Sequence, residues 1–176
     1  DHYLNKMKQL IITGLPRSGT TLLGNIIGSC QNVEYFFEPP LLNLLFKKLI
    51  DRVDEESWKE IYDFYIKQDL VNESLAGRRF NFNPNDDTFV YKTRSEEIVK
   101  SRFEKSWRSS ELEMLAESIV FSFKIPGIDD WLLKFQKIKP EAVIVIMVRK
   151  PEYVIFSIKN KGWFNDQSPH IIKPFN

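Results

Sequence analysis

The sequence is poor in the residues that carry disulfide and histidine chemistry. It has one cysteine, Cys30, which excludes an internal disulfide, and we expect this side chain to be buried at the end of a helix. A lone cysteine favours a reducing compartment and hence a cytoplasmic protein. The two histidines, His2 and His170, lie near the ends of the chain and belong to no motif.

Long apolar runs and an excess of charge are also missing. The longest apolar run, residues 142–148, has the length of a strand, whereas a membrane-spanning helix needs about 20 residues, so we expect no membrane span. The net charge of +1 argues against general nucleic-acid binding. A chain of 176 residues, 43% of them hydrophobic, fits one domain over residues 1–176 with a sizeable core.

What the sequence does contain is a phosphate-binding pattern at residues 10–23. A short apolar run is followed by a turn bounded by Gly14 and Gly19, and then by apolar residues at helical spacing. A strand, a tight loop and a helix N-terminus in this order bind anions through inward-pointing N–H groups and the helix dipole. The glycines keep the spacing of a Walker A loop, but Thr20 stands at the lysine position and Arg17 is the nearby cation. The pattern therefore predicts an anion site without the lysine and Mg²⁺ arrangement of an ATPase.

Residues 14–23, Gly-Leu-Pro-Arg-Ser-Gly-Thr-Thr-Leu-Leu, resemble the 5′-phosphosulfate loop of sulfotransferases that use 3′-phosphoadenosine 5′-phosphosulfate (PAPS). The Pro-Arg-Ser-Gly-Thr-Thr form is similar to the tyrosylprotein and carbohydrate branches of that family. The resemblance implies that the loop binds the 5′-phosphate of the donor through Pro16, Arg17, Ser18, Gly19, Thr20 and Thr21. The alternative is an ordinary turn in which Ser18 caps the helix, but the apolar flanks on both sides favour the phosphate loop.

Strand-like and helical patterns alternate along the rest of the chain. Strands are expected at 33–37, 88–91, 119–123 and 142–148, and helices at 20–28, 41–50, 58–66, 96–107, 111–117, 129–138 and 152–161. The alternation predicts an α/β fold, a P-loop-type three-layer sandwich with a central parallel sheet flanked by helices. The run 142–148 is apolar on both faces and should be a central strand. Residues 77–87 are typical of a loop, either a lid or an acceptor-binding loop.

Residues 148–157, Val-Arg-Lys-Pro-Glu-Tyr-Val-Ile-Phe-Ser, look like the 3′-phosphate motif of the same family. The resemblance implies that Arg149 and Ser157 bind the 3′-phosphate of the donor, which suits the fork of an arginine. The family usually has Asp or Asn after the arginine, so Lys150 is a departure, and it adds positive charge. The alternative for the motif in isolation is a strand-end arginine in a surface ion pair.

Glu38, Lys124 and Arg149 all follow strands at their carboxyl ends, where parallel sheets bind ligands. Phe-Phe-Glu-Pro around Glu38 looks like the carbohydrate branch, in which a glutamate at this place is catalytic. The resemblance implies that Glu38 is the base for the acceptor, on a strand (33–37) that we expect beside the first strand. The alternative is a glutamate that only caps the next helix. Other branches of the family use a histidine as the base, so His170 remains an alternative candidate for this role.

Phe-Lys-Ile-Pro at residues 123–126 resembles the Lys-x-Pro of the tyrosylprotein branch, whose lysine approaches the bridging oxygen of the donor. The resemblance implies a catalytic role for Lys124, alongside Arg17 of the loop. Lys92 is the rival for this role and Arg94 is a candidate acceptor contact, but solvated strand-end side chains explain both at least as well.

Together the four motifs imply a sulfotransferase that moves a sulfuryl group from PAPS to a hydroxyl of a carbohydrate or glycan-like small-molecule acceptor and releases adenosine 3′,5′-bisphosphate (PAP). No metal is expected, because a sulfuryl group carries less negative charge than a phosphoryl group. Residues 51–107 match no motif, and we expect acceptor specificity there. Domains of this family generally run longer, so the resemblance implies absent C-terminal or internal segments. The alternatives are a P-loop nucleotide kinase and a non-catalytic nucleotide-binding module, and the oligomeric state stays open.

Overall fold

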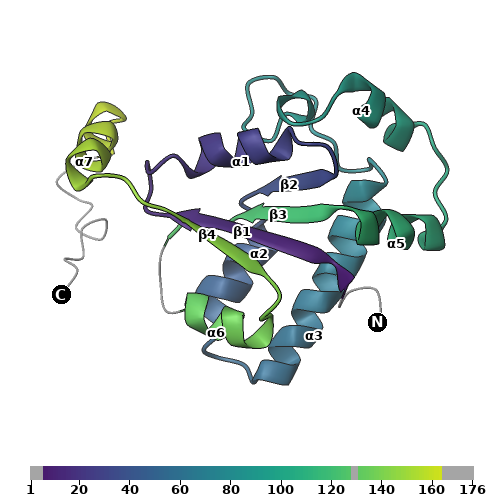
Figure 1. Ribbon diagram of the computed structural model, residues 1–176, viewed down its shortest axis with the longest axis horizontal. Helices are drawn as coiled ribbons and strands as arrows, with labels where there is room; N and C mark the ends of the chain where they lie inside the picture. Colours follow the sequence, from purple (N-terminus) through teal and green to yellow (C-terminus); the bar gives the residue numbers. More distant parts are fainter. Residues whose placement is uncertain (1–5, 128–130, 164–176) are drawn as a thin grey trace.

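Four parallel strands form the sheet at the centre of the molecule. A computed structural model describes residues 6–127 and 131–163, and its sheet has the order β2–β3–β1–β4 (Figure 1). The strands are β1 (Lys8–Gly14), β2 (Val33–Phe37), β3 (Val120–Lys124) and β4 (Val143–Met147). The expected α/β fold with a central parallel sheet flanked by helices is confirmed.

Helices lie on both sides of this sheet. They are α1 (Thr20–Gly28), α2 (Pro40–Leu44), α3 (Glu55–Tyr65), α4 (Glu96–Phe103), α5 (Ser109–Ser118), α6 (Trp131–Ile138) and α7 (Pro151–Asn160). Two π-helical segments, η2 (Leu45–Leu49) and η3 (Ile66–Leu75), continue α2 and α3, and η4 (Val90–Lys92) is a 3₁₀ turn. Figure 1 shows α1 on one side of the sheet, with α2, α3 and α6 on the other.

The core on the side of α2, α3 and α6 is aromatic. Phe46 is fully buried, and its ring lies 4.7 Å from that of Trp131 and 4.9 Å from that of Phe135 between centroids. Trp58 and Tyr62 stack on each other at 5.1 Å and complete the cluster. Trp58 and Tyr62 lie four residues apart, at helical spacing, on the buried face of α3.

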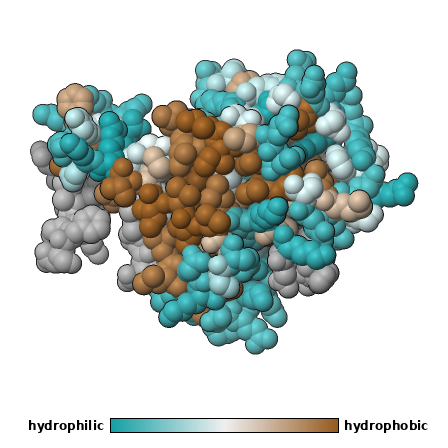
Figure 2. Space-filling view, viewed as in Figure 1, coloured by the Kyte–Doolittle hydropathy of each residue, from teal (hydrophilic) through white to brown (hydrophobic). Residues whose placement is uncertain are grey.

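The prediction of a central, fully buried strand at 142–148 is wrong in one respect. Within the described residues β4 is an edge strand, paired only with β1. Val143 is 58% exposed and Ile146 46% exposed, and Leu22 and Ile26 of α1 are also exposed. Figure 2 shows a broad apolar area on this face of the molecule. An apolar run indicates a strand, but it does not encode how many neighbours that strand has.

Four smaller predictions also need correction. The strand 33–37 lies beside β3 rather than beside β1, and the proposed strand 88–91 is a 3₁₀ turn with an isolated bridge from Phe89 to Asn81. Helix α4 ends at Phe103 rather than at residue 107. Cys30 is exposed, because α1 ends before it at Gly28.

Some expectations fall where the structure makes no statement. His2 and His170 lie outside the described residues, as do the first residues of the helix expected at 129–138. Over residues 6–127 and 131–163, none of the helices combines the length and the apolar character that crossing a bilayer requires.

Candidate functional site

The loop between β1 and α1 is held in a tight conformation by glycines. Gly14 ends β1 against β4, where an added Cβ would lie 2.6 Å from the carbonyl oxygen of Met147, so only glycine fits. Gly19 has a φ of 101°, in the region that favours glycine, and Arg17 has a φ of 66°, which is strained for a residue with a side chain. The Ser18 N–H donates to the Leu15 carbonyl at 3.1 Å and closes the turn.

This loop fits an anion at the N-terminus of α1. Gly19 is the N-cap, no side chain caps the helix, and its first turn contains no acidic residue, so the helix dipole is unopposed there. The capping alternative for Ser18 is therefore wrong. Its Oγ is buried and has no hydrogen-bond partner within the described residues, which is the signature of a polar group arranged for a ligand.

The loop and the second phosphate motif meet in space, although they are 140 residues apart in sequence. Arg17 Nε donates to Ser157 Oγ at 3.0 Å, and Arg149 Nη1 donates to the Arg17 carbonyl at 3.0 Å. The Arg17 guanidinium also lies 5.6 Å from the centre of the Trp163 ring. Two guanidinium groups are thereby gathered at one rim of the loop, which suits a ligand with more than one phosphate.

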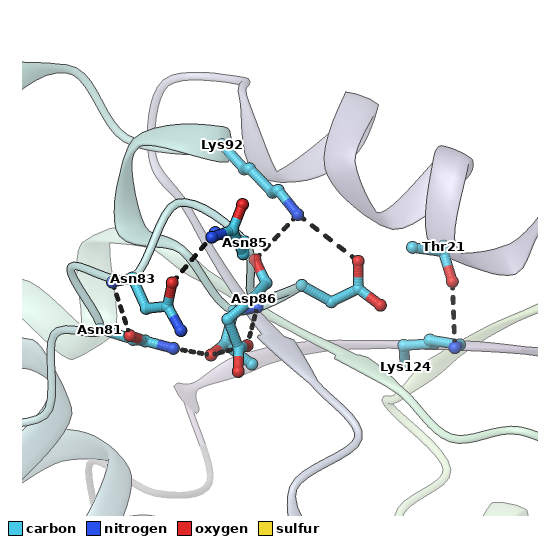
Figure 3. A network of polar contacts seen from close by, with 9 residues as sticks. Thr21, Asn81, Asn83, Asn85, Asp86, Lys92 and Lys124 are labelled. Atoms are coloured by element: carbon cyan, nitrogen blue, oxygen red, sulfur yellow. Dashed lines mark hydrogen bonds and ion pairs between the residues drawn. The ribbon is translucent and has the colours of Figure 1, made fainter.

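Glu38 and Lys124 lie at the ends of neighbouring strands, β2 and β3, and form an ion pair. Lys124 Nζ lies 2.5 Å from Glu38 Oε1 and donates to Thr21 Oγ1 at 3.1 Å (Figure 3), so it links the carboxylate to the loop. Its ammonium lies 4.3 Å from the centre of the Phe37 ring. The Lys124 side chain is 8% exposed and the Glu38 side chain 34% exposed, so a ligand reaches the carboxylate more readily than the ammonium. Glu38 has a φ of 44°, a strained conformation at the end of its strand.

The two rival cations have other partners. Lys92 donates to the Asp86 carbonyl at 2.8 Å and lies 3.4 Å from Asp87, away from Thr21 and Lys124 in Figure 3. Arg94 is not a solvated strand-end residue, because its guanidinium forms an ion pair with the buried Glu34. Lys124 is therefore the lysine that the fold brings to the loop.

One cavity of about 750 Å³ joins these groups. The expected site residues that line it are Pro16, Arg17, Gly19, Thr20, Thr21, Glu38, Lys124 and Arg149. Ser18 and Ser157 do not line this cavity. Ser18 is buried within the loop, and Ser157 accepts the hydrogen bond from Arg17.

Sequence reasoning missed three polar or aromatic residues of this cavity, Asp87, Lys161 and Trp163. Asp87 ends the irregular segment 77–87, where only its acidic side chain could have indicated a role in the site. Lys161 and Trp163 follow α7, beyond the motif that ends at Ser157.

Tyr35 lies next to this site but does not supply a base. Burial raises the pKa of the Tyr35 phenol well above its usual range, and the nearby carboxylates of Glu38 and Asp87 raise it further. The phenol therefore stays protonated under ordinary conditions. Glu38 and Asp87 are the carboxylates that line the cavity.

A parallel sheet with an uncapped, glycine-bounded loop at the carboxyl end of its first strand defines an α/β protein of the P-loop type. A family model described as the sulfotransferase family matches residues 9–173, and the chain belongs to that family. No curated protein and no solved structure matches the chain. The activity class is therefore sulfotransfer by a transferase enzyme.

Proposed function

We propose that this protein transfers a sulfuryl group from PAPS to a hydroxyl of a carbohydrate or glycan-like acceptor and releases PAP. The observation that carries this proposal is the contact of Arg17 with both Ser157 and Arg149, at one rim of a cavity that also contains the Glu38–Lys124 pair. A donor with phosphates at its 5′ and 3′ positions requires two separated anion sites. Both resembling motifs supply residues to this one cavity.

The residues present suit such a donor. The first-turn amides of α1 and the side chains of Thr20 and Thr21, which line the cavity, would bind the 5′ side of the donor. Arg149, which lines the cavity and donates to the Arg17 carbonyl, provides the second anion contact. The Ser18 N–H is used within the turn, so it does not contribute to this binding.

Glu38 would take the proton of the acceptor hydroxyl, and Lys124 would donate a hydrogen bond to the departing phosphate oxygen. The donor supplies an activated sulfuryl group: a bond forms between the acceptor oxygen and sulfur, and the sulfur–oxygen bond to the phosphate breaks with its electron pair. Before the donor binds, the Lys124 ammonium neutralises Glu38. An anion at Thr21 would compete for Lys124 and leave Glu38 free to act as a base.

A P-loop kinase is the second candidate, and it is disfavoured. Thr20 stands where the phosphate-binding lysine would be, and β4 is followed by Val148 and Arg149 rather than by an acidic residue for Mg²⁺. A non-catalytic nucleotide-binding module would have no use for a strained glutamate paired with a lysine beside the loop.

Calorimetric titration with PAP, beside Mg²⁺-ATP, tests the proposal. We expect metal-independent binding of PAP that weakens by about 10- to 100-fold in Arg149→Ala, because a charge-assisted hydrogen bond is lost. Lys150→Ala is the matched control, since Lys150 is an exposed cation next to Arg149 that does not line the cavity. Preference for Mg²⁺-ATP, or equal losses in both variants, would contradict a specific PAP site.

A further inference from the structure

A second cavity of about 240 Å³ adjoins the donor cavity. Phe37 lines both cavities, so the two cavities meet at this residue. Phe37 and Pro39 line the second cavity, and Glu38, between them in sequence, lines the first. A molecule in the second cavity would therefore lie beside the carboxylate that we propose as the base.

The second cavity is lined by flat apolar rings and by neutral polar groups. The rings are those of Phe36, Phe37, Tyr65 and Phe80. Burial raises the pKa of Tyr65 to about 12, with Asp69 adding to the effect, so this phenol remains neutral. The π-helical segment η3 contributes Ser74 to the wall, and π-helical turns frequently occur at functional sites.

Both cations of this cavity are already paired. Arg79 forms two hydrogen bonds to Asp69, at 2.9 and 3.0 Å, and Arg94 is bound to Glu34. A carboxylate or sulfate entering the cavity would lose its water and would have to compete with Asp69 and Glu34 for these guanidinium groups. The lining therefore favours an uncharged occupant.

Side-chain hydrogen bonds hold the loop around Asn81 and Thr88, which lines the second cavity, and this argues against a lid function of residues 77–87. Asn81 donates to Thr88 Oγ1 at 2.7 Å and accepts from the Asn83 N–H at 2.9 Å. Asp86 accepts from the Thr88 N–H at 2.7 Å, and Figure 3 shows this network beside the site. Side chains that bond to nearby backbone in this way hold a loop in one conformation.

We infer that this second cavity binds one uncharged six-membered ring of the acceptor, with the reactive hydroxyl directed past Phe37 and Pro39 toward Glu38. The aromatic walls pack against the faces of a ring, and Ser74 and Asn81 lie where they can contact its substituents. A neutral sugar and a phenol share this chemistry. The inference rests on the proposed function.

The decisive variant is Ser74→Leu, which fills the cavity. Its matched control is Ser118→Leu, because Ser118 lies on α5 outside both cavities. Both serine hydroxyls donate to a helix carbonyl, at 3.0 Å for Ser74 and 2.7 Å for Ser118. The probes are methyl glucoside, phenol and glucuronate, titrated by calorimetry with and without PAP. PAP release from PAPS gives the kinetic readout.

We expect one neutral probe to bind, and the identity of that probe distinguishes a sugar from a phenol. Ser74→Leu should raise its Kd and KM by about tenfold or more without changing the affinity for PAP, while Ser118→Leu changes neither. Glucuronate should bind at least about tenfold more weakly than methyl glucoside. Phe80→Ala is a second variant, which keeps the test valid if Ser74→Leu fails to fold. It should raise the Kd of the probe by about three- to tenfold, because an aromatic wall of the cavity is lost. Its control is Phe82→Ala, because Phe82 is half-exposed and does not line the cavity.

The failures are distinguishable. If PAP binds but neither neutral probe does, or if both cavity variants leave the Kd of the probe within about twofold of wild type, the ring site is wrong and the donor site stands. Preference for glucuronate also overturns it. If PAP does not bind, the proposed function fails, and the titrations without PAP still decide whether the cavity accepts a ring.

Discussion

Glu34 lies on β2 and Glu38 directly follows this strand, yet the two glutamates have different surroundings. The Glu34 side chain is 3% exposed and is shared by Arg94 and Arg102, which come from the segments that cover the sheet. The Glu38 side chain is 34% exposed, has a strained backbone and pairs with one lysine at the rim of a cavity. Glu34 is enclosed by its partners, whereas Glu38 can exchange its partner when a ligand arrives.

This difference separates charge that holds a fold together from charge that is available for chemistry. A buried pair is costly to break because the remaining charge has no water and no alternative partner. A half-exposed pair costs little to rearrange, because water and an incoming anion replace the lost contact. Four variants or conditions test whether the two glutamates really differ in this way.

The largest effect is expected from Glu34→Ala. Removing this carboxylate leaves the guanidinium groups of Arg94 and Arg102 buried without a counterion, which should lower the free energy of unfolding by about 3–5 kcal/mol. Urea denaturation followed by tryptophan fluorescence measures the change. A decrease in the free energy of unfolding below about 1 kcal/mol would mean that Glu34 stabilises the fold no more than a surface ion pair does.

Glu38→Gln should instead remove activity and keep the fold. Loss of a general base lowers turnover by about 10²–10⁴-fold, while the affinity for PAP and the midpoint of urea denaturation should change little. Asp87→Asn is the matched control, because Asp87 also lines the donor cavity. If Asp87→Asn abolishes turnover and Glu38→Gln does not, the base has been assigned to the wrong carboxylate.

Thr21→Val should have a smaller effect on the same site. It removes the hydroxyl that accepts from Lys124 at 3.1 Å, and we expect turnover to fall by about tenfold through poorer positioning of the ammonium. Thr21→Ser keeps the hydroxyl and should retain most of the activity. Equal losses in the two variants would indicate that the methyl group, and not the hydrogen bond, matters here.

The smallest effect concerns Asp86, which bonds to Thr88 in the wall of the second cavity. Hydrogen bonds from the Thr88 N–H and hydroxyl hold the pKa of the Asp86 carboxyl below its usual range, so its stabilising contribution is complete above the unfolded pKa. The contribution is lost as pH falls through the lower folded pKa. The chemical shift of the Thr88 N–H, followed by NMR, should stay constant from pH 8 to about 5 and change only in more acidic solution. A transition near neutral pH would show that another group controls this loop.

Local patterns in the sequence were sufficient for much of this protein. The loop Gly14–Gly19, the four strand segments and the amphipathic helices are encoded by residues close together in the chain, because turns, strand runs and helical faces depend on neighbours within a few positions. The positions of Glu38, Lys124 and Arg149 at carboxyl strand ends followed in the same way. The expected strand at 88–91 was wrong because so short a β-branched and aromatic run does not distinguish a strand from a 3₁₀ turn.

Only the tertiary structure decided which strands lie side by side and which charges meet. The order β2–β3–β1–β4 brings Lys124 to Glu38 and leaves β4 at the edge, and the packing of the chain pairs Arg94 with Glu34. The second cavity likewise combines β2, η3 and the loop around Asn81, three segments with no shared local pattern. These features depend on contacts between residues far apart in the chain, whose pairing is determined by the packing of the whole core and not by local propensity.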